Sequence, residues 1–411
     1  MGRYRQCKDV SVNLLQLPGI LPRGAFVKDG ELTPGWTQNE LTSSLNFKLA
    51  AGRWWDITGR FYAATDTGEV YRGNDGVTLE RIYSDGGDSP FFFETYDREL
   101  NIVLVSGSYY TAFRDGISIH DRLSGRLSCG AMRNGRLFGA ADGDGYTLKW
   151  SGVKSYADWS SANSDSGKLT LEPPGGVILN VVDFGDELVI FRQYCIVRFA
   201  AWGDTENFRV KETISVPPVT RNAQLIAGDS ILFFTSAGLM RYRGGSVTRV
   251  EGAVTEDLIK VTSVFAHGDR FIFFAGTSRS FKSDVVYVYD RLRDCCQFLD
   301  IPAYLIAQDS VGVLAYTPSK IYRLYYQNGS YNYSVETPEI NFGYRGRKLL
   351  KYIEIDCDDG LILHVNNGRS TRKIPSANGR VTLNMRGKEF KITLEGVGAV
   401  RSAVAVAEVP V

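Results

Sequence analysis

A short apolar phrase recurs along most of this chain, and it constrains the fold more than any other feature of the sequence. Its seven copies begin at Arg60, Glu99, Arg136, Glu187, Ser230, Arg270 and Val311. Successive copies therefore start 37 to 51 residues apart. A ladder of about 40 residues that contains several short strands is typical of the four-stranded blade of a β-propeller. The count predicts a propeller of about seven blades, with six or eight as the alternatives.

The residues around each phrase support this interpretation. Six of the seven copies follow a turn such as Asn134-Gly135 or Gly228-Asp229, and most precede a second aromatic strand such as 285–289. The inner strands of a propeller are covered on both faces by neighbouring blades, so they should be continuously apolar. The runs 231–234 and 271–274 have this character, and we expect them on inner strands. The 43 Gly, 22 Tyr and 22 Phe residues, without any sustained helical period, favour an all-β chain.

The repeat divides the chain into three regions. Residues 1–44 are expected to form an irregular lead-in, one strand of which is a candidate to close the ring, and residues 45–340 the propeller. Residues 345–411 change character, because short apolar runs are separated there by dipeptides such as Asp359-Gly360 and Asn367-Gly368. Such dipeptides are hairpin signals. The sequence therefore predicts a small C-terminal β-sandwich that packs on the propeller or on a partner.

Charge, cysteine usage and hydropathy limit the classes of function. The 47 basic and 46 acidic side chains leave a formal charge of +1, which disfavours a general nucleic-acid-binding protein. The six cysteines form no Cys-x-x-Cys pair and mostly lie in apolar runs, so we expect buried thiols and assembly in a reducing compartment. No secretory signal follows Met1, and no apolar run approaches the roughly 20 residues of a membrane span. We expect a protein made in the cytoplasm, without a membrane span.

Candidate catalytic and metal-binding residues are sparse. The histidines His120, His267 and His364 lie in different repeats or regions, and none has another His or Cys at the spacing of a zinc site. No nucleophile elbow, Walker loop or dinucleotide-binding glycine motif is present. The turn 142–145, Asp-Gly-Asp-Gly, lacks the spaced oxygen ligands of a calcium loop. We therefore predict no metal, no cofactor and no enzymatic activity.

Glycoside hydrolysis must be considered, because some β-propellers are glycosidases. It needs two carboxylates about 5 to 9 Å apart, and the sequence does not show which of its 46 acids would pair. Sialidase propellers carry repeated Asp boxes of the form Ser-x-Asp-x-Gly-x-Thr-Trp. Residues 65–68 and 164–167 match only the Asp-x-Gly kernel, which is a common hairpin turn. A propeller glycosidase is therefore the weakest alternative.

The longest spacing between two copies of the phrase contains a segment unlike the other repeats, residues 142–174. Trp150, Tyr156 and Trp159 lie there among small polar residues. Aromatic side chains often anchor protein interfaces, so these three are the candidate partner-contact residues. The other interpretation is that their rings close a small core beneath a long loop.

The same stretch resembles a known family. The order is Arg-Leu-Phe-Gly-Ala-Ala at 136–141, Leu-Lys-Trp-Ser at 148–151, Ala-Asp-Trp at 157–159 and Gly-Asp-Glu-Leu-Val-Ile-Phe at 185–191. It is similar to the propeller-bearing tail proteins of short-tailed bacteriophages, the packaged-DNA stabilisation, tail-hub or nozzle proteins. In these, a strand ending in Trp-Ser, an Asp-Trp or Asp-Phe loop and a Leu-Val-Ile-Phe strand follow one another. The similarity is clear over roughly residues 130–200, loose elsewhere, and includes no catalytic residue.

The resemblance implies a structural protein of the virion tail. Such a subunit would form a homo-oligomeric ring, of six copies, that docks on a portal or adaptor ring and contacts other tail proteins. The ring would continue the DNA channel, retain the packaged DNA and take part in DNA ejection without sequence-specific binding. A charge of +1 suits this role, because tight phosphate contacts would hinder sliding DNA. The alternative is a receptor- or glycan-binding propeller that uses exposed aromatic residues.

Overall fold

The structure is a computed structural model of the whole chain. It describes residues 7–17, 20–43, 45–56, 58–84, 90–97, 99–106, 109–114, 117–123, 125–141, 143–155, 159, 165–250, 257–327, 332–358, 360–376 and 378–410. These residues form strands joined by turns and three short 3-10 helices, η1 (Leu14–Gln16), η2 (Pro173–Gly175) and η3 (Thr205–Asn207). The prediction of an all-β chain is confirmed.

Most strands belong to four-stranded antiparallel sheets that follow one another along the chain. The first three sheets are β6–β9 (Leu49–Trp55, Arg60–Thr65, Val70–Gly73, Leu79–Tyr83), β10–β13 (Phe91–Asp97, Glu99–Ser106, Tyr109–Arg114, Ile117–Arg122) and β14–β17 (Leu127–Arg133, Arg136–Ala141, Thr147–Trp150, Gly167–Thr170). The next two are β18–β21 (Ile178–Phe184, Glu187–Arg192, Cys195–Ala200, Arg209–Ser215) and β22–β25 (Val219–Ala227, Ser230–Thr235, Gly238–Arg243, Ser246–Arg249). Then come β26–β29 (Leu258–His267, Phe271–Ser278, Asp284–Asp290, Cys295–Leu299) and β30–β32 (Leu305–Gln308, Val313–Tyr316, Lys320–Tyr326).

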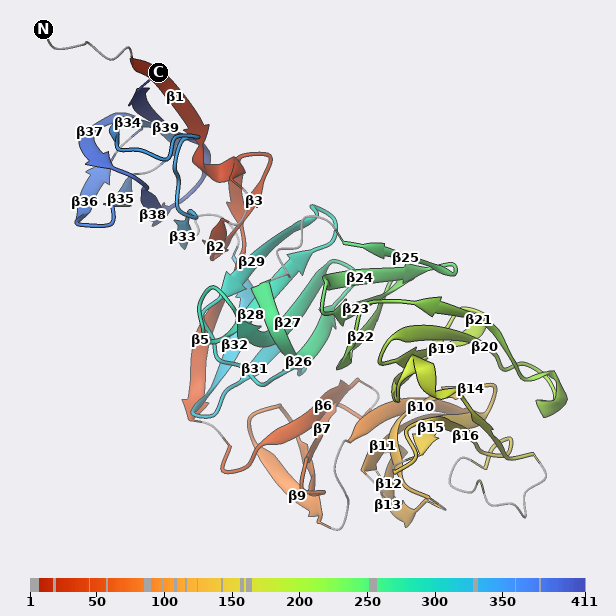
Figure 1. Cartoon of the computed structure of the whole chain (residues 1–411). Helices are drawn as coiled ribbons and strands as arrows, with labels where there is room; N and C mark the ends of the chain where they lie inside the picture. The colour runs from red at the N-terminus through yellow and green to blue at the C-terminus, as the bar shows by residue number, and fades with distance from the viewer. Residues whose placement is uncertain are drawn as a thin grey trace, which may run out of the picture.

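The sheets are arranged in a ring (Figure 1). Each sheet shares a buried apolar cluster with the sheet before it and another with the sheet after it. A further cluster joins β30–β32 to β6–β9, through Leu314 of one sheet and Phe61 of the other. The chain of contacts therefore returns to its starting point.

A strand from the N-terminal region completes the last sheet. β5 (Trp36–Ser43) pairs antiparallel with β32, from Trp36 opposite Tyr326 to Ser43 opposite Lys320. Residues 36–43 thus lie in the ring, although they belong to the predicted lead-in. Trp36 also packs edge-on against Phe273, with ring centroids 4.9 Å apart, and so ties β5 to the neighbouring sheet.

The recurring apolar phrase occupies one position in every sheet of the ring. All seven copies lie on the second strand of their sheet (β7, β11, β15, β19, β23, β27 and β31), whereas the first strands of neighbouring sheets contact one another at the centre of the ring. Phe233 on β23 and Phe273 on β27 are fully buried. The second strand is covered by a sheet on each face. The first strand keeps exposed residues, such as Arg221 on β22.

The C-terminal residues form a separate unit of two sheets around one core. One sheet has the order β1 (Cys7–Asn13), β39 (Val400–Pro410), β34 (Lys348–Cys357), β37 (Gly379–Gly387). The other contains β33 (Asn332–Glu336), β38 (Lys391–Val397), β35 (Leu361–Asn366) and β36 (Thr371–Ser376). Leu350 and Ala405 of the first sheet share a buried cluster with Leu363 and Leu394 of the second. β1 and β33 come from outside 345–411, so this unit draws on both ends of the chain.

A short strand joins the two units. β2 (Leu21–Arg23) pairs parallel with β29 at Arg23 opposite Phe298 and antiparallel with β33. It thereby links β26–β29 and the β33 sheet into one nine-stranded sheet. The hairpin of β3 (Ala25–Lys28) and β4 (Glu31–Pro34) follows it, beside the junction (Figure 1).

No helix among the described residues is long and apolar enough to cross a membrane.

Candidate functional site

Trp150, the first predicted partner-contact residue, belongs to the core. It ends β16 and is only 7% exposed. Its ring centroid lies 5.3 Å from that of Phe208 and 6.3 Å from that of Phe199, both from the sheet β18–β21 or its loops. The interpretation of Trp150 as a surface anchor is therefore corrected, because its ring fills the space between two sheets.

The other two predicted residues do not join Trp150 in one surface. Trp159 is partly buried and packs against a different cluster, which contains Leu127 and Leu137 at the interface with β10–β13. Tyr156 lies outside the described residues. The core interpretation of this loop thus fits the two tryptophans that the structure describes.

Two exposed apolar side chains, Val153 and Trp202, lie near the turn between β14 and β15. Asn134 and Gly135 both have positive φ values, 49° and 72°, as a two-residue hairpin of type I′ requires. The side-chain amide of Asn134 donates a hydrogen bond to the carbonyl of Ala201 at 2.9 Å. Trp202, the next residue, is 50% exposed, and Val153, which flanks Gly135, is 47% exposed. We call Asn134, Gly135, Val153 and Trp202 the Trp202 surface.

Sequence reasoning missed Trp202. The only signal was the phrase Trp202-Gly203-Asp204, a turn sequence directly after the apolar strand β20. An aromatic residue placed on a turn is a better candidate for a surface position than Trp150, which ends a strand.

The buried carboxylates are held in structural networks. Glu187 accepts hydrogen bonds from Arg198 Nε at 2.9 Å and Lys211 Nζ at 3.2 Å, and another from the Tyr242 hydroxyl. Burial raises the pKa of the Glu187 carboxyl, but these three donors outweigh burial and hold its pKa below the usual range. A carboxylate kept ionised by three donors is poorly suited to act as a general acid.

Asp309 is held in a similar way. Its two oxygens accept from Arg323 Nη1 at 2.7 Å and Nη2 at 2.8 Å, and Oδ1 also accepts from the backbone amides of Val311 and Gly312. Burial raises the pKa of this carboxyl, and the four donors lower it by more. Asp309 therefore stabilises the turn before β31.

The histidines and other metal-ligand residues do not gather. His267 Nδ1 lies 3.2 Å from Gln308 Oε1, and His364 Nε2 lies 3.1 Å from Glu395 Oε2 in the C-terminal unit. His120 lies on β13, in a different sheet from the other two. Within the described part of the chain, no group of three or more His, Cys, Asp or Glu side chains could hold a metal ion.

Comparison with known proteins bears on the fold alone. No protein-family model and no curated protein matches the chain. Raptor from Chaetomium thermophilum is similar over 72% of this chain and 29% of its own, with 11% identity and a TM-score of 0.52. The Cps50 (Swd1) β-propeller domain of Myceliophthora thermophila (10% identity, 70% of this chain, 99% of that one) and the Pan2 WD40 domain of Neurospora crassa (11%, 70% and 95%) each have a TM-score of 0.49.

The chain contains a β-propeller. This follows from the ring of four-stranded antiparallel sheets, in which buried clusters join each sheet to the next and the last to the first. At 10 to 11% identity these similarities show nothing about function.

Proposed function

We propose that the chain is a structural subunit of the tail of a short-tailed bacteriophage, a hub or nozzle protein that forms a ring and continues the DNA channel. The observation that supports this proposal is the order of motifs in residues 136–191, which resembles the propeller-bearing tail proteins. The described residues of this range lie on or between β15 and β19, in two neighbouring sheets, whereas Ala157 and Asp158 of the Ala-Asp-Trp motif lie outside the described residues. The motifs therefore belong to one structural feature of the ring.

The finer architecture is part of the same proposal. The seven four-stranded groups, with β5 as the last strand, would be the blades of one propeller. This adds residues 36–43 to the predicted range 45–340 and leaves β33 (332–336) to the C-terminal unit. Two sheets that share one core would make the C-terminal unit, 345–411 with β1 and β33, a β-sandwich. The lead-in, 1–44, would contribute strands to both parts.

Assembly would use surfaces other than sheet edges. A closed propeller has no free innermost edge, and its outer strands are short, so partners would bind appended parts. The C-terminal unit is one such part. The Trp202 surface, which lies on turns of the ring rather than on a sheet edge, is a second candidate contact. In a closed ring of identical copies with more than two members, each subunit would present two different patches to its neighbours.

The proposed subunit is not an enzyme. The described acidic residues with the greatest burial are paired with Arg, Lys, Tyr or backbone donors, as Glu187 and Asp309 are. A formal charge of +1 for the whole chain fits a channel through which DNA slides without tight phosphate contacts.

Electron microscopy of the purified full-length chain tests the proposal. We expect rings with a central hole, either alone or after mixing with a portal or adaptor ring. A Trp202→Ala, Val153→Ser double variant should abolish ring formation, whereas Leu292→Ala, at a 77% exposed side chain on another sheet, should not. If the chain instead stays monomeric under all these conditions and binds to a glycan array, the result would support a receptor- or glycan-binding propeller. Turnover of a glycoside that is lost on changing one carboxylate would refute the non-enzymatic part.

A further inference from the structure

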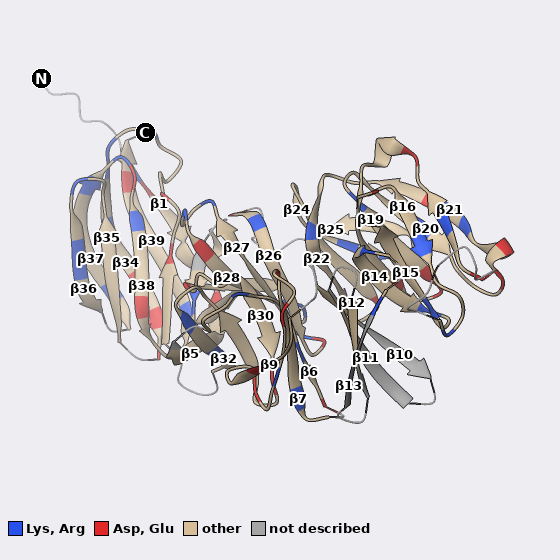
Figure 2. Cartoon of the chain, turned by 90° about the horizontal axis from the view of Figure 1, so that it is seen from below, with Lys and Arg blue, Asp and Glu red and all other residues tan. Residues whose placement is uncertain are grey.

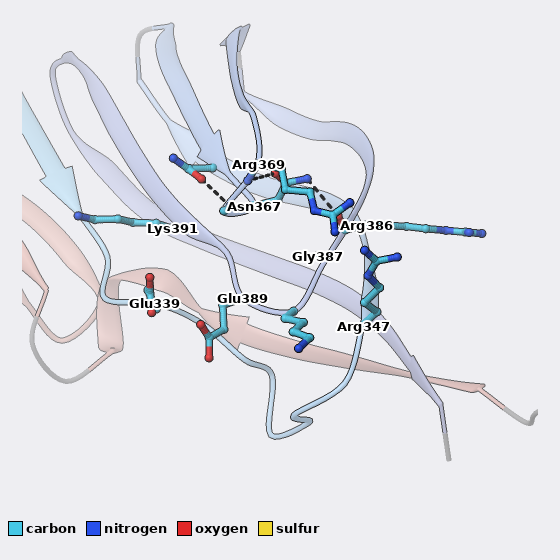
Figure 3. A pocket seen from close by; sticks show the side chains of 11 residues that line it. Glu339, Arg347, Asn367, Arg369, Arg386, Gly387, Glu389 and Lys391 are labelled. Atoms are coloured by element: carbon cyan, nitrogen blue, oxygen red, sulfur yellow. Dashed lines mark hydrogen bonds between the residues drawn. The ribbon is translucent and has the colours of Figure 1, made fainter.

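A charged pocket lies at one end of the C-terminal unit. Its volume is about 560 Å³, and three chain segments form its walls. These are the turn after β35, the turn between β37 and β38, and the segment 339–347 that leads into β34. Figure 3 shows Glu339 and Glu389 close together on one side of the pocket and Arg347 on the other.

Hydrogen bonds hold the three walls together. The Asn367 side-chain amide donates to the Arg386 carbonyl at 3.0 Å, which joins the first turn to the second. Ile340 and Phe390 exchange backbone hydrogen bonds of 2.8 and 3.1 Å, which join the second turn to the third segment. The ammonium of Lys348, only 3% exposed, donates to the Lys388 carbonyl. The pocket is therefore preformed, and a ligand would bind without ordering its walls.

The pocket concentrates positive charge. Its lining residues include five cations, Arg347, Arg369, Arg386, Lys388 and Lys391, and two acids, Glu339 and Glu389. Lys391 forms an ion pair with Glu336 at 2.7 Å. The other four cations form no ion pair with any residue that the structure describes. The whole chain is nearly neutral, but residues 339–391 contain eleven Lys and Arg and six Asp and Glu residues.

We propose that this pocket binds a sugar phosphate. Arg347 and Arg369 reach it from different walls, and the guanidinium fork matches a phosphate group with two parallel hydrogen bonds. Glu339 and Glu389 would repel a second phosphate, but a carboxylate is a strong acceptor for sugar hydroxyls. The phosphate would therefore lie toward Arg347 and the sugar toward the two acids. The volume falls in the range of small-molecule sites.

The pocket is less suited to a nucleic acid. A DNA strand places phosphates along an extended line, and proteins that bind it offer a continuous basic groove. Here two turns and the segment 339–347 line a compact, partly open pocket, and two carboxylates lie among the cations. The inference does not depend on the proposed tail function, because it rests only on the residues that line this pocket. Ring formation and ligand binding can therefore fail independently.

Calorimetric titration of the full-length chain with glucose 6-phosphate tests the proposal. Glucose, inorganic phosphate and a 12-base-pair DNA duplex are the comparison ligands. We expect glucose 6-phosphate to bind at least tenfold more tightly than glucose or inorganic phosphate, and its binding to weaken as salt is raised. Equal binding of inorganic phosphate would overturn the sugar part of the proposal. Absence of glucose 6-phosphate binding at millimolar concentration, or tighter binding of the duplex, would overturn it entirely.

Matched variants locate the binding. Arg347→Gln and Arg369→Gln should each weaken glucose 6-phosphate binding by about tenfold or more, since a charged hydrogen-bond donor is lost. Glu389→Gln should weaken binding of glucose 6-phosphate more than that of inorganic phosphate. Lys373→Gln, at an exposed cation on β36 outside the pocket, should change neither. Unchanged thermal midpoints would show that each variant is folded, and an equal loss in Lys373→Gln would refute the location. Figure 2 shows that Lys and Arg residues occur on several strands of this unit, so this control is needed.

Discussion

The hydroxyl of Tyr242 donates a hydrogen bond to the carboxylate of Glu187, and these residues belong to neighbouring sheets of the ring. Tyr242 is fully buried, and Glu187 is 4% exposed. Burial and the adjacent carboxylate both raise the pKa of the Tyr242 phenol, so it stays a donor at all ordinary pH values. The bond fixes β24 against β19 and joins Tyr242 to the network that Arg198 and Lys211 form around Glu187.

We expect Tyr242→Phe to destabilise the protein by about 1.5 to 3 kcal/mol, because a hydrogen bond to a charged acceptor is lost in a buried place. The midpoint of urea unfolding measures this change. Tyr325→Phe is the control, since Tyr325 donates to Asn39 in an exposed place and should cost less than about 0.5 kcal/mol. Equal effects of the two variants would contradict the assignment of Tyr242 to a buried inter-sheet bond.

Glu187 should also make stability depend on acid pH. Its folded-state pKa lies below the unfolded-state value, so its contribution is fully present above the unfolded value and is lost as the pH falls through the folded value. The difference in free energy of unfolding between the wild type and Glu187→Gln should therefore be largest near neutral pH. It should shrink below about pH 4. A difference that is the same at pH 7 and pH 3 would show that Glu187 is not ionised in the folded protein.

Gln297 joins the strand that completes the last sheet to the sheet beside it. Its Oε1 accepts from the backbone amide of Trp36 at 2.7 Å, and its Nε2 donates to the carbonyl of Trp36 at 2.8 Å. Gln297 is 1% exposed, so Gln297→Ala would leave both backbone groups buried without a partner, at a cost of about 2 to 4 kcal/mol. Gln16→Ala, at an exposed side chain, should be nearly neutral. Thermal unfolding compares the two, and a neutral Gln297→Ala would mean that β5 is not anchored there.

The sequence located the second strand of each sheet of the ring and offered one strand of residues 1–44 to close the ring, but it did not identify which distant segments pair. The recurring phrases mark the second strands, as at 230–234 and 270–274, because continuous burial on both faces leaves a local apolar signature. The first strands lack this signature, since they keep exposed residues such as Arg221 on β22. The pairing of β5 with β32, and of β1 with β39, joins segments more than 270 residues apart, and no local pattern specifies such partners.

Surface sites were harder to predict for a related reason. Trp150 and Trp202 are both followed by small residues, and whether a ring points into an interface between sheets depends on packing that the sequence does not display. The charged pocket of the C-terminal unit is assembled from three segments between 339 and 391. Each segment alone reads as an ordinary charged turn, and only the fold brings their side chains together.

Thiol labelling checks the burial of the cysteines. Cys7 is exposed, and Cys129, Cys195, Cys295, Cys296 and Cys357 are buried. Burial raises the pKa of Cys129 to about 11 and that of Cys295 to about 12, which keeps both as unreactive thiols at neutral pH. A disulfide-exchange reagent at pH 8 should label one cysteine in the native protein and all six after denaturation. Rapid labelling of two or more native cysteines would contradict this arrangement of the sheets.

The contrast between Trp150 and Trp202 separates folding from assembly. Trp150→Ala should cost about 3 to 5 kcal/mol, because it opens a cavity among Phe138, Phe199 and Phe208. Trp202→Ala should stay within about 0.5 kcal/mol of the wild type, because half of that side chain is already exposed to solvent. Urea unfolding measures both changes.

Native mass spectrometry of the same samples then reports the oligomeric state. If the Trp202 surface is an interface, Trp202→Ala should abolish assembly at unchanged stability, whereas any loss of assembly in Trp150→Ala should follow the loss of folded protein. Normal assembly of Trp202→Ala would remove this surface from the proposed ring contacts.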